Sequence, residues 1–412
     1  MPPFSHRWVA LALVACAVGS TAACGQRPAS ADTGREALLE WVRTNAVEVT
    51  PEALGRLAGD ARVVAIGESA HGVEATLALR NAVFQQLIRH HGFTGVALET
   101  GFAESRRIAD FVAGGPGEAR EVARTSFTSG FGTFQANADL LAWMREFNRT
   151  APVSKRVRFF GIDLSLGGPV ASWATSSPVE CALEALAAGR VREAAALRHS
   201  FEAEIAPALS RQTPLSPAEQ DRYAAFARRL AVAAESSRNP VTMRCAVVAE
   251  QAGEVSRVTP APGPGGIPPA AWRSLEARDM AMAENAVWAL DQLGPRGRLL
   301  VFAHNAHVIN EPQRGSHLKA LAQPPRSMGQ RLREKLGNDL VIVAEAALGR
   351  TADAAELGDL LRTMTSGTRL LDLRQAPSGA RGWLLHPQRL RANVDGHAMV
   401  TPSTAFDALL VR

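Results

Sequence analysis

Short apolar runs alternate with longer amphipathic segments along the first part of this 412-residue chain, and this alternation is the strongest constraint on its fold. Residues 62–66 (R-V-V-A-I) predict a buried strand, residues 75–91 an amphipathic helix, and residues 94–98 a second strand. Strand–helix–strand repetition is typical of a parallel sheet with right-handed crossovers. We therefore predict an α/β fold with a parallel-rich central sheet flanked by helices. Two further helices and a third strand are expected at residues 103–112, 138–148 and 157–162.

The strand signals disappear between residues 179 and 292, where the sequence is rich in Ala, Arg and Glu with helical periodicity. Inside this region Ser216, Pro217 and Glu219 form the pattern of a helix start with a capping box. Strands are expected again at residues 298–302 and 339–344, with weaker candidates near Leu370 and Trp383. An all-helical subdomain is thus predicted as an insertion into the α/β core, with boundaries at 35–177 (core, first part), 178–294 (helical insertion) and 295–412 (core, second part).

The N-terminus has the pattern of an export signal over residues 1–24. His6 and Arg7 precede a compact apolar run at residues 8–18, and small residues at 20–23 stand directly before Cys24. The segment T-A-A-C-G resembles a bacterial lipoprotein signal, in which this cysteine receives the lipid. Cleavage without lipidation and an uncleaved anchor are the alternatives. The expected protein is exported, either as a cell-envelope lipoprotein that meets the membrane only through its N-terminal lipid or as a secreted or periplasmic protein, with a flexible tether at residues 25–34.

Export places the folded body in an oxidising compartment, where disulfides form. Cys181 and Cys245 are the only cysteines after the signal, and both fall in expected helices of the insertion. The spacing alone leaves two interpretations open: a disulfide between them, or two separately buried thiols.

The formal net charge of +5 comes from arginine, because only Lys155, Lys319 and Lys335 are lysines. These arginines are scattered along the sequence, and aromatic residues make up only 6% of it. Nucleic-acid binders usually gather basic residues on one face and interleave aromatic residues for stacking. We therefore expect no nucleic-acid partner.

Ionisable residues follow three of the expected strands. Glu68 and His71 come directly after the first, Glu99 after the second, and His304 and His307 after the strand at 298–302. If these strands are parallel neighbours, all of these side chains meet at one edge of the sheet, where open α/β folds place their ligands. The sequence therefore predicts a site at this edge.

Two common kinds of nucleophile are disfavoured in such a site. The sequence has no G-x-S-x-G nucleophile elbow, and Cys181 and Cys245 lie in the helical insertion without an adjacent histidine. What remains is acid–base chemistry on water. An imidazole can take a proton from water near neutral pH, and a nearby carboxylate can fix its tautomer and stabilise the imidazolium.

Several motifs, in this order along the chain, resemble those of the erythromycin esterase family. They are G-E-S-A-H-G (67–72), Arg80, A-L-E (97–99), F-G-I-D (160–163), R-D-M-A-M-A-E-N (278–285) and F-A-H-N-A-H-V (302–308). The resemblance implies a hydrolase that opens ester or macrolactone bonds without a serine nucleophile and without a cofactor. It implies that His71 is the general base, that Glu68 or Glu99 orients it, and that Arg80 and His304 stabilise the oxyanion. His307, Asp163 and Arg278 would then contact substrate.

Other interpretations of the same residues remain open. The histidines and carboxylates could hold zinc or manganese in a metal-dependent hydrolase, and a lipid-tethered protein could bind a small molecule or haem without turning it over. Arg80 could form a surface ion pair, Asp163 could only cap a turn, and Arg278 with Asp279 could be an ordinary helix-surface pair.

The chain also departs from the family pattern at residues 131–148. Family members tend to carry a tryptophan there that lines the site, whereas this chain has F-G-T-F-Q-A-N at 131–137. We expect Trp143 to pack its helix rather than touch substrate.

Overall fold

An eight-stranded sheet forms the centre of the protein. The computed structural model describes residues 29–164, 177–211, 214–260, 268–346, 356–391 and 396–412. The strand order is β1-β7-β10-β6-β2-β5-β3-β4, and the six strands from β10 to β4 run parallel while β1, β7 and β10 pair antiparallel. A separate hairpin joins β8 to β9. The strands are β1 (Val47–Glu48), β2 (Val63–Glu68), β3 (Gly95–Gly101), β4 (Arg158–Asp163), β5 (Leu299–His304), β6 (Leu340–Ala346), β7 (Arg369–Asp372), β8 (Gln388–Arg391), β9 (His397–Val400) and β10 (Ala408–Val411).

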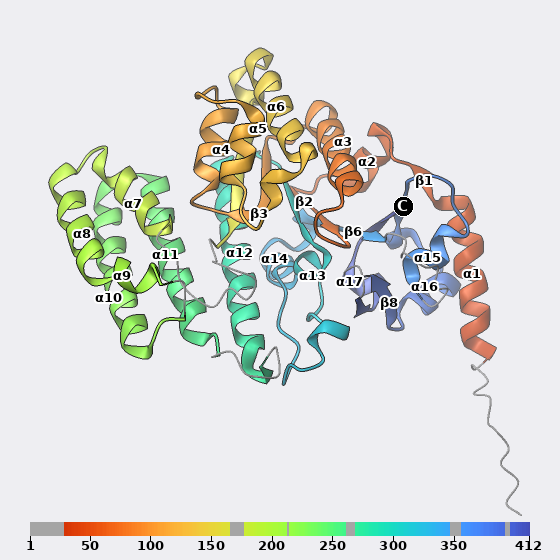
Figure 1. Cartoon of the computed structure of the whole chain (residues 1–412). Coiled ribbons are helices and arrows are strands. Elements are labelled where there is room, and N and C mark those ends of the chain that lie inside the picture. Colours follow the sequence, from red (N-terminus) through yellow and green to blue (C-terminus); the bar gives the residue numbers. More distant parts are fainter. Residues whose placement is uncertain (1–28, 165–176, 212–213, 261–267, 347–355, 392–395) are drawn as a thin grey trace, which may run out of the picture.

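Helices cover both faces of this sheet, as the strand–helix alternation predicts (Figure 1). The three predicted strands and the predicted helices of the first half are present within a few residues of the expected bounds. The α/β class is therefore confirmed. The helices of the core are α1 (Ala29–Asn45), α2 (Pro51–Ala58), α3 (Glu74–His91), α4 (Ser105–Val112), α5 (Ala119–Ser126), α6 (Gln135–Thr150), α13 (Asn305–Val308), α14 (Met328–Leu336), α15 (Leu357–Arg362), α16 (Ser378–Leu384) and α17 (Pro402–Ala405).

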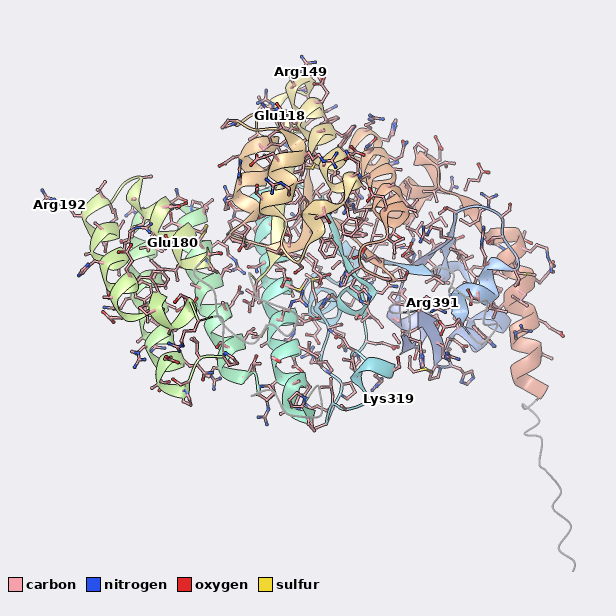
Figure 2. The ribbon with its side chains drawn as sticks, viewed as in Figure 1. Glu118, Arg149, Glu180, Arg192, Lys319 and Arg391 are labelled. Atoms are coloured by element: carbon pink, nitrogen blue, oxygen red, sulfur yellow. A yellow bond between two sulfur atoms is a disulfide. The ribbon has the colours of Figure 1, made fainter. Side chains whose placement is uncertain are left out.

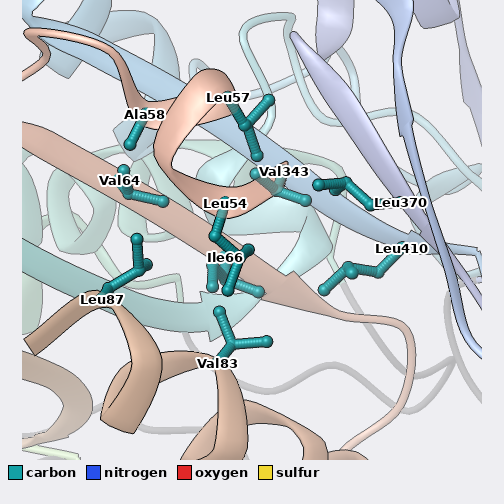
Figure 3. Close-up of a pocket in the computed structure, with 10 residues that line it drawn as sticks. All are labelled: Leu54, Leu57, Ala58, Val64, Ile66, Val83, Leu87, Val343, Leu370 and Leu410. Carbon is teal, nitrogen blue, oxygen red and sulfur yellow. The ribbon is translucent and has the colours of Figure 1, made fainter. Parts of the chain in front are cut away.

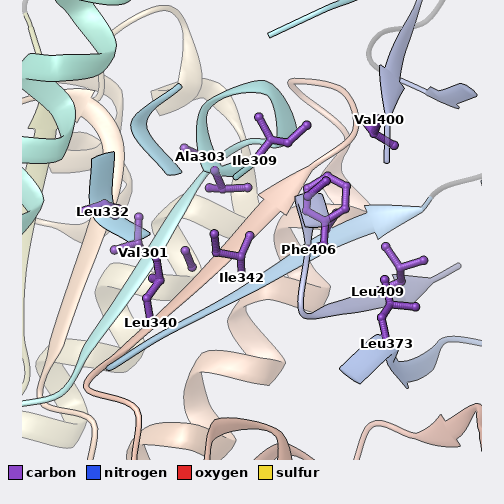
Figure 4. Packing of buried hydrophobic residues seen from close by; sticks show 14 of the residues in the cluster. Val301, Ala303, Ile309, Leu332, Leu340, Ile342, Leu373, Val400, Phe406 and Leu409 are labelled. Atoms are coloured by element: carbon purple, nitrogen blue, oxygen red, sulfur yellow. The ribbon is translucent and has the colours of Figure 1, made fainter. Parts of the chain in front are cut away.

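Every residue of β2, β5 and β6 is buried, because the sheet is covered on both sides. Alternate side chains of these strands enter two different cores. Val301, Ile342 and Leu409 pack with Leu332 and Phe406 on one face (Figure 4). The opposite face packs against α2 and α3 around a small apolar gap of about 10 Å³ (Figure 3). This gap is lined by Leu54, Leu57, Ala58, Val64, Ile66, Val83, Leu87, Val343, Leu370 and Leu410.

The described elements of the segment between β4 and β5 are all helices. The first five extend to one side of the sheet (Figure 1), whereas the last, α12 (Trp272–Gln292), packs against the sheet and buries Met282 and Leu290 in its core. The segment has its own core around Phe201, Tyr223 and Phe226. The predicted capping box at Ser216 is present, and Glu219 accepts a hydrogen bond from the Ser216 backbone N–H at 2.8 Å. The helices are α7 (Ser177–Ala187), α8 (Val191–Glu204), α9 (Ala206–Leu209), α10 (Pro217–Ser237), α11 (Pro240–Val258) and α12 (Trp272–Gln292).

A disulfide joins α7 to α11 through Cys181 and Cys245, whose Cα atoms lie 5.8 Å apart. The sequence left open whether these cysteines form a disulfide or are two separate buried thiols, and in the structure they form the disulfide. Charged side chains cover the exterior of these and the other elements, as the labelled residues of Figure 2 illustrate: Glu118, Arg149, Glu180, Arg192, Lys319 and Arg391.

Two expectations need correction. Trp383 lies in helix α16, not in a strand, whereas Leu370 does lie in β7. The last part of the predicted tether is helical, because α1 begins at Ala29 and buries Leu38 and Val42 in the core. The signal, Cys24 and residues 25–28 lie outside the described residues. None of the described helices combines the length and apolar character needed to cross a membrane.

Candidate active site

The carboxyl ends of β2, β5 and β3 lie side by side and carry the ionisable residues that the sequence singled out. β5 pairs in parallel with β2 on one side and with β3 on the other, and Glu68 is in register with His304. Glu99 lies near the end of β3. The expected convergence of the three strand ends is therefore present.

Glu68 and His71 form a hydrogen-bonded pair at the end of β2. Oε1 of Glu68 lies 2.6 Å from Nδ1 of His71. The Glu68 side chain is only 1% exposed, whereas 43% of the His71 side chain is exposed. Burial raises the pKa of the Glu68 carboxyl, against the opposing effect of the His71 hydrogen bond. None of the described residues hydrogen-bonds to Oε2 of Glu68.

The acidic surroundings of His71 favour its charged form. Desolvation acts to lower the pKa of this imidazole, but the hydrogen bond to Glu68 and the charges of Glu99 and Glu68 outweigh it, so the pKa is raised. With Nδ1 bonded to Glu68, Nε2 is the nitrogen left to exchange a proton at the exposed side. Of the two carboxylates considered for orienting His71, Glu68 is the one in contact.

His304 lies next to His71, with ring centroids 4.9 Å apart. Its Nδ1 accepts a hydrogen bond from the backbone N–H of Ala306 at 3.1 Å. Because an accepting nitrogen carries no proton, a proton on the His304 ring is carried by Nε2. Phe131 packs edge-on against His71 with a centroid separation of 5.3 Å. An aromatic ring from the divergent segment at 131–137 therefore contacts the proposed base, although it is a phenylalanine.

Glu99 belongs to a second group of charges beside this pair. Its Oε2 accepts from the backbone N–H of His304 at 2.8 Å, and its Oε1 accepts from Arg278 at 2.8 Å. Nε2 of His307 lies 3.3 Å from the same Oε1. Desolvation acts to raise the pKa of Glu99, but the charges of His307 and Arg278 hold it well below its ordinary value. Glu99 is thus an ionised carboxylate.

His307 is buried between two carboxylates and the guanidinium of Arg278, whose Nη1 lies 3.2 Å from Nε2 of His307. Its Nδ1 lies 2.7 Å from Oδ1 of Asp279. Desolvation and the charge of Arg278 act to lower the pKa of His307, but Asp279 and Glu99 outweigh them and raise it to about 10. Arg278 completes the group through a two-pronged contact to Asp163, at 2.9 and 2.6 Å. The interpretation of Arg278 and Asp279 as a surface pair is wrong, because Asp279 is fully buried.

Asp163 has both roles considered for it. Its Oδ1 accepts from the backbone N–H of Leu164 at 2.7 Å, as a capping residue does, and both of its oxygens also bind Arg278.

Arg80 takes a position that the sequence did not indicate. It is only 2% exposed, so the surface-pair interpretation is wrong. Its guanidinium donates to the side-chain oxygens of Asn81 and Asn137 and lies 4.9 Å from the ring centroid of Phe302. Burial lowers its pKa to about 10, and the charges of Glu68 and Glu74 partly oppose this. The guanidinium of Arg80 therefore lies buried beside Phe302 of β5, close enough to Glu68 for their charges to interact.

Sequence reasoning missed three buried polar residues of this region: Asp279, Asn305 and Glu345. Glu345 directly follows the strand predicted at residues 339–344, so the rule that selected Glu99 applies to it as well. Asp279 and Asn305 lie inside the quoted motifs, but the sequence alone does not indicate whether a polar side chain on a helix is buried or exposed. In the described part of the chain, no three His, Cys, Asp or Glu side chains are arranged to hold a metal ion.

The sheet and the cluster at its strand ends define an α/β protein with a histidine–carboxylate site. The chain belongs to the erythromycin esterase family, because the model of that family, described as Erythromycin esterase, matches residues 88–411. The resemblance carried by the short motifs is thereby confirmed. The matched range begins after the turn that contains Glu68 and His71.

Two curated relatives align with a shorter stretch of the chain. Erythromycin esterase type II of Escherichia coli is 34% identical over 115 residues, which are 28% of this chain and 26% of the relative. Erythromycin esterase type I of the same organism is 31% identical over 104 residues, which are 25% and 24% of the two chains. The alignments thus span about a quarter of each relative.

Solved structures share the fold over most of its length. A protein from Bacillus cereus has a TM-score of 0.75 at 20% identity and covers 91% of this chain and 96% of its own. A succinoglycan biosynthesis protein has a TM-score of 0.75 at 18% identity with the same coverage. An erythromycin esterase mutant in its open conformation has a TM-score of 0.62 at 20% identity, covering 87% and 92%.

Proposed function

We propose that this protein is a hydrolase that cleaves an ester or lactone bond with water activated by His71. The observation that carries the proposal is the hydrogen-bonded pair of Glu68 and His71, in which the carboxylate is buried and the imidazole is exposed. Membership of the erythromycin esterase family and the names of the two curated relatives support an ester as the bond cleaved.

In the proposed reaction, Nε2 of His71 removes a proton from water while the water oxygen attacks the ester carbonyl. Glu68 holds Nδ1 and stabilises the imidazolium that forms. A negative charge develops on the carbonyl oxygen, and the Nε2 proton of His304 is suited to stabilise it. His71 then returns the proton to the leaving alkoxide. An ester gives an acid and an alcohol, and a lactone gives one hydroxy acid.

The roles of the remaining predicted residues follow from their surroundings. We assign Arg80 an electrostatic role without substrate contact. Its guanidinium is buried among amide side chains, and its charge interacts with that of Glu68. Glu99, Asp163, Arg278 and His307 form one connected group of charges together with Asp279. We propose that this group contacts substrate through Arg278, whose side chain is 22% exposed. The macrolactone ring of a macrolide is the first substrate class to test.

The test is a mass-spectrometric assay of the signal-free protein against macrolides, simple lactones and simple esters. A lactone that gains the mass of one water in the presence of wild type, but not of His71→Ala, supports the proposal. His90→Ala is the matched control, since His90 is an exposed histidine on α3. Activity in His71→Ala would refute the assigned base. Loss of activity with a chelator would favour a metal-dependent hydrolase, and binding without turnover would favour a binding protein.

We also propose that the protein is exported and lipidated at Cys24. Metabolic labelling with a fatty acid in a bacterial host tests this directly. Label is expected in the wild type and not in Cys24→Ser, and absence of label from a processed wild-type protein would favour secretion without a lipid.

A further inference from the structure

The turn that contains His71 is not held by the sheet. β2 pairs with β6 as far as Gly67 and with β5 as far as Glu68, so the backbone from Ser69 onward lies beyond the strand ladder. Gly72 has a φ of +74°. Val73, at the N-cap position of α3, forms no side-chain hydrogen bond to the start of the helix. Other contacts must therefore fix the orientation of His71.

Glu345, at the end of β6, supplies such contacts from a fully buried position. Its side chain is only 2% exposed. Its Oε2 accepts from the backbone N–H of Ser69 at 3.0 Å and from the Ser69 hydroxyl at 2.8 Å. Its Oε1 accepts from the Thr76 hydroxyl at 2.8 Å and lies 3.0 Å from Nε of Arg412. One carboxylate thus joins the start of the turn to the first turn of α3.

Asn305 links this carboxylate residue to the strand that carries His304. The amide of Asn305 donates to the backbone oxygen of Glu345 at 2.9 Å and accepts from its N–H at 3.3 Å. Because β2 lies between β5 and β6, the Asn305 side chain crosses β2, above Gly67. A Cβ atom at position 67 would lie 2.2 Å from Oδ1 of Asn305, so only glycine leaves room for this crossing.

We infer that Glu345 is a positioning residue, which fixes the turn of His71 and, together with Asn305, sets the distance between His71 and His304. This inference rests on the proposed function. Glu345 bonds directly to the turn that carries the base, and Asn305, which bonds to the backbone of Glu345, is the neighbour of His304. A misplacement of a catalytic group by about 1 Å can cost about 100-fold in rate.

The test compares three variants of the whole protein. Glu345→Gln replaces one acceptor oxygen with a donor, which cannot accept from both Ser69 and Thr76. Ser69→Ala removes one bond to Glu345 but keeps the negative charge, which separates position from charge. Asp407→Asn is the control, because Asp407 bonds to the Ile342 backbone N–H at 2.7 Å on the same strand, away from the turn.

Two readouts are measured: kcat and KM for the substrate found in the hydrolysis assay, and the NMR titration of the His71 ring. The other groups that face this ring are Glu68, Glu99, His304 and His307. We expect kcat to fall at least about ten-fold in Glu345→Gln, with KM within about two-fold. The His71 midpoint should fall in both Glu345→Gln and Ser69→Ala, as the bond to Glu68 loosens. Asp407→Asn should change neither readout.

The inference is overturned if His71 titrates as in the wild type in both folded variants, or if kcat follows thermal stability equally in all three. The titration needs no substrate. If the wild type hydrolyses no ester and yet the titration shifts, the hydrolase proposal fails while the positioning of His71 by Glu345 stands.

Discussion

Oε1 of Glu68 lies 2.6 Å from Nδ1 of His71, and only two residues separate the pair in the chain. β2 ends at Glu68, and the turn that follows brings His71 back over the strand end. The strand holds the carboxylate inside the protein, and the turn leaves the imidazole exposed. The strand end and the turn after it thus leave Glu68 buried and His71 exposed, although the two residues are close in the chain.

Replacement of Glu68 by Gln should remove the charge of this pair while keeping its shape. We expect kcat to fall about 10²- to 10⁴-fold with little change in KM, because the imidazolium formed in the reaction loses its buried counter-charge. Steady-state kinetics on the substrate found in the hydrolysis assay measure this. Glu121→Gln, which alters an exposed carboxylate paired with Arg107, is the control and should behave as wild type. An unchanged kcat in Glu68→Gln would show that the pair is not part of the reaction.

The rate should also depend on pH in a definite direction. His71 acts as a base only in its neutral form, and its pKa is raised above the ordinary value of about 6.5. Activity should therefore fall as the pH is lowered, with a midpoint above about 6.5. In Glu68→Gln this midpoint should move to lower pH, since the charge that favours the imidazolium is gone. A wild-type midpoint at or below about 6.5 in the profile of kcat/KM would contradict this.

The sequence predicted those parts of the fold and site that depend on local pattern. The run at residues 62–66 and the polar residues after it located β2, Glu68 and His71, because a fully buried strand and its end are visible in a short window. The parallel order of the strands then brought Glu99 and His304 to the same edge.

What the sequence could not supply was the pairing of side chains across the site. Both Glu68 and Glu99 were suitable partners for His71, and only the register and the turn decide between them. Arg80 lies on the amphipathic helix α3, where neighbouring positions along the chain alternate between buried and exposed faces. The sequence pattern therefore did not decide whether its side chain is buried. Short strands such as β10 were missed because a four-residue apolar run at 408–411 is as compatible with other structures.

His307 should make the stability of the protein depend on pH. Its folded pKa, about 10, is raised above the unfolded value of about 6.5. Its contribution to the free energy of unfolding is therefore fully present below about pH 6.5 and is lost as the pH rises toward 10. His307→Gln should cost about 3–5 kcal/mol at pH 6, because Asp279 and Glu99 lose a buried cation, and less at pH 9. Urea unfolding of both proteins at the two pH values measures the difference, and an equal cost at both would refute the buried imidazolium.

The disulfide between Cys181 and Cys245 should stabilise the helical region without taking part in the proposed chemistry. It joins α7 to α11 across a sequence separation of 64 residues. Its removal therefore increases the conformational entropy of the unfolded chain, which lowers the free energy of unfolding. We expect the double variant Cys181→Ser/Cys245→Ser to lose about 2–4 kcal/mol of unfolding free energy. Its kcat should stay near that of the wild type at temperatures where both are folded, because neither cysteine contacts the strand ends. Treatment of the wild type with a reductant should reproduce the loss and should leave the double variant unaffected. A reductant effect of the same size on both proteins would show that the cross-link is not the cause. A reducing compartment would keep both thiols free, so this stabilisation depends on the proposed export of the protein.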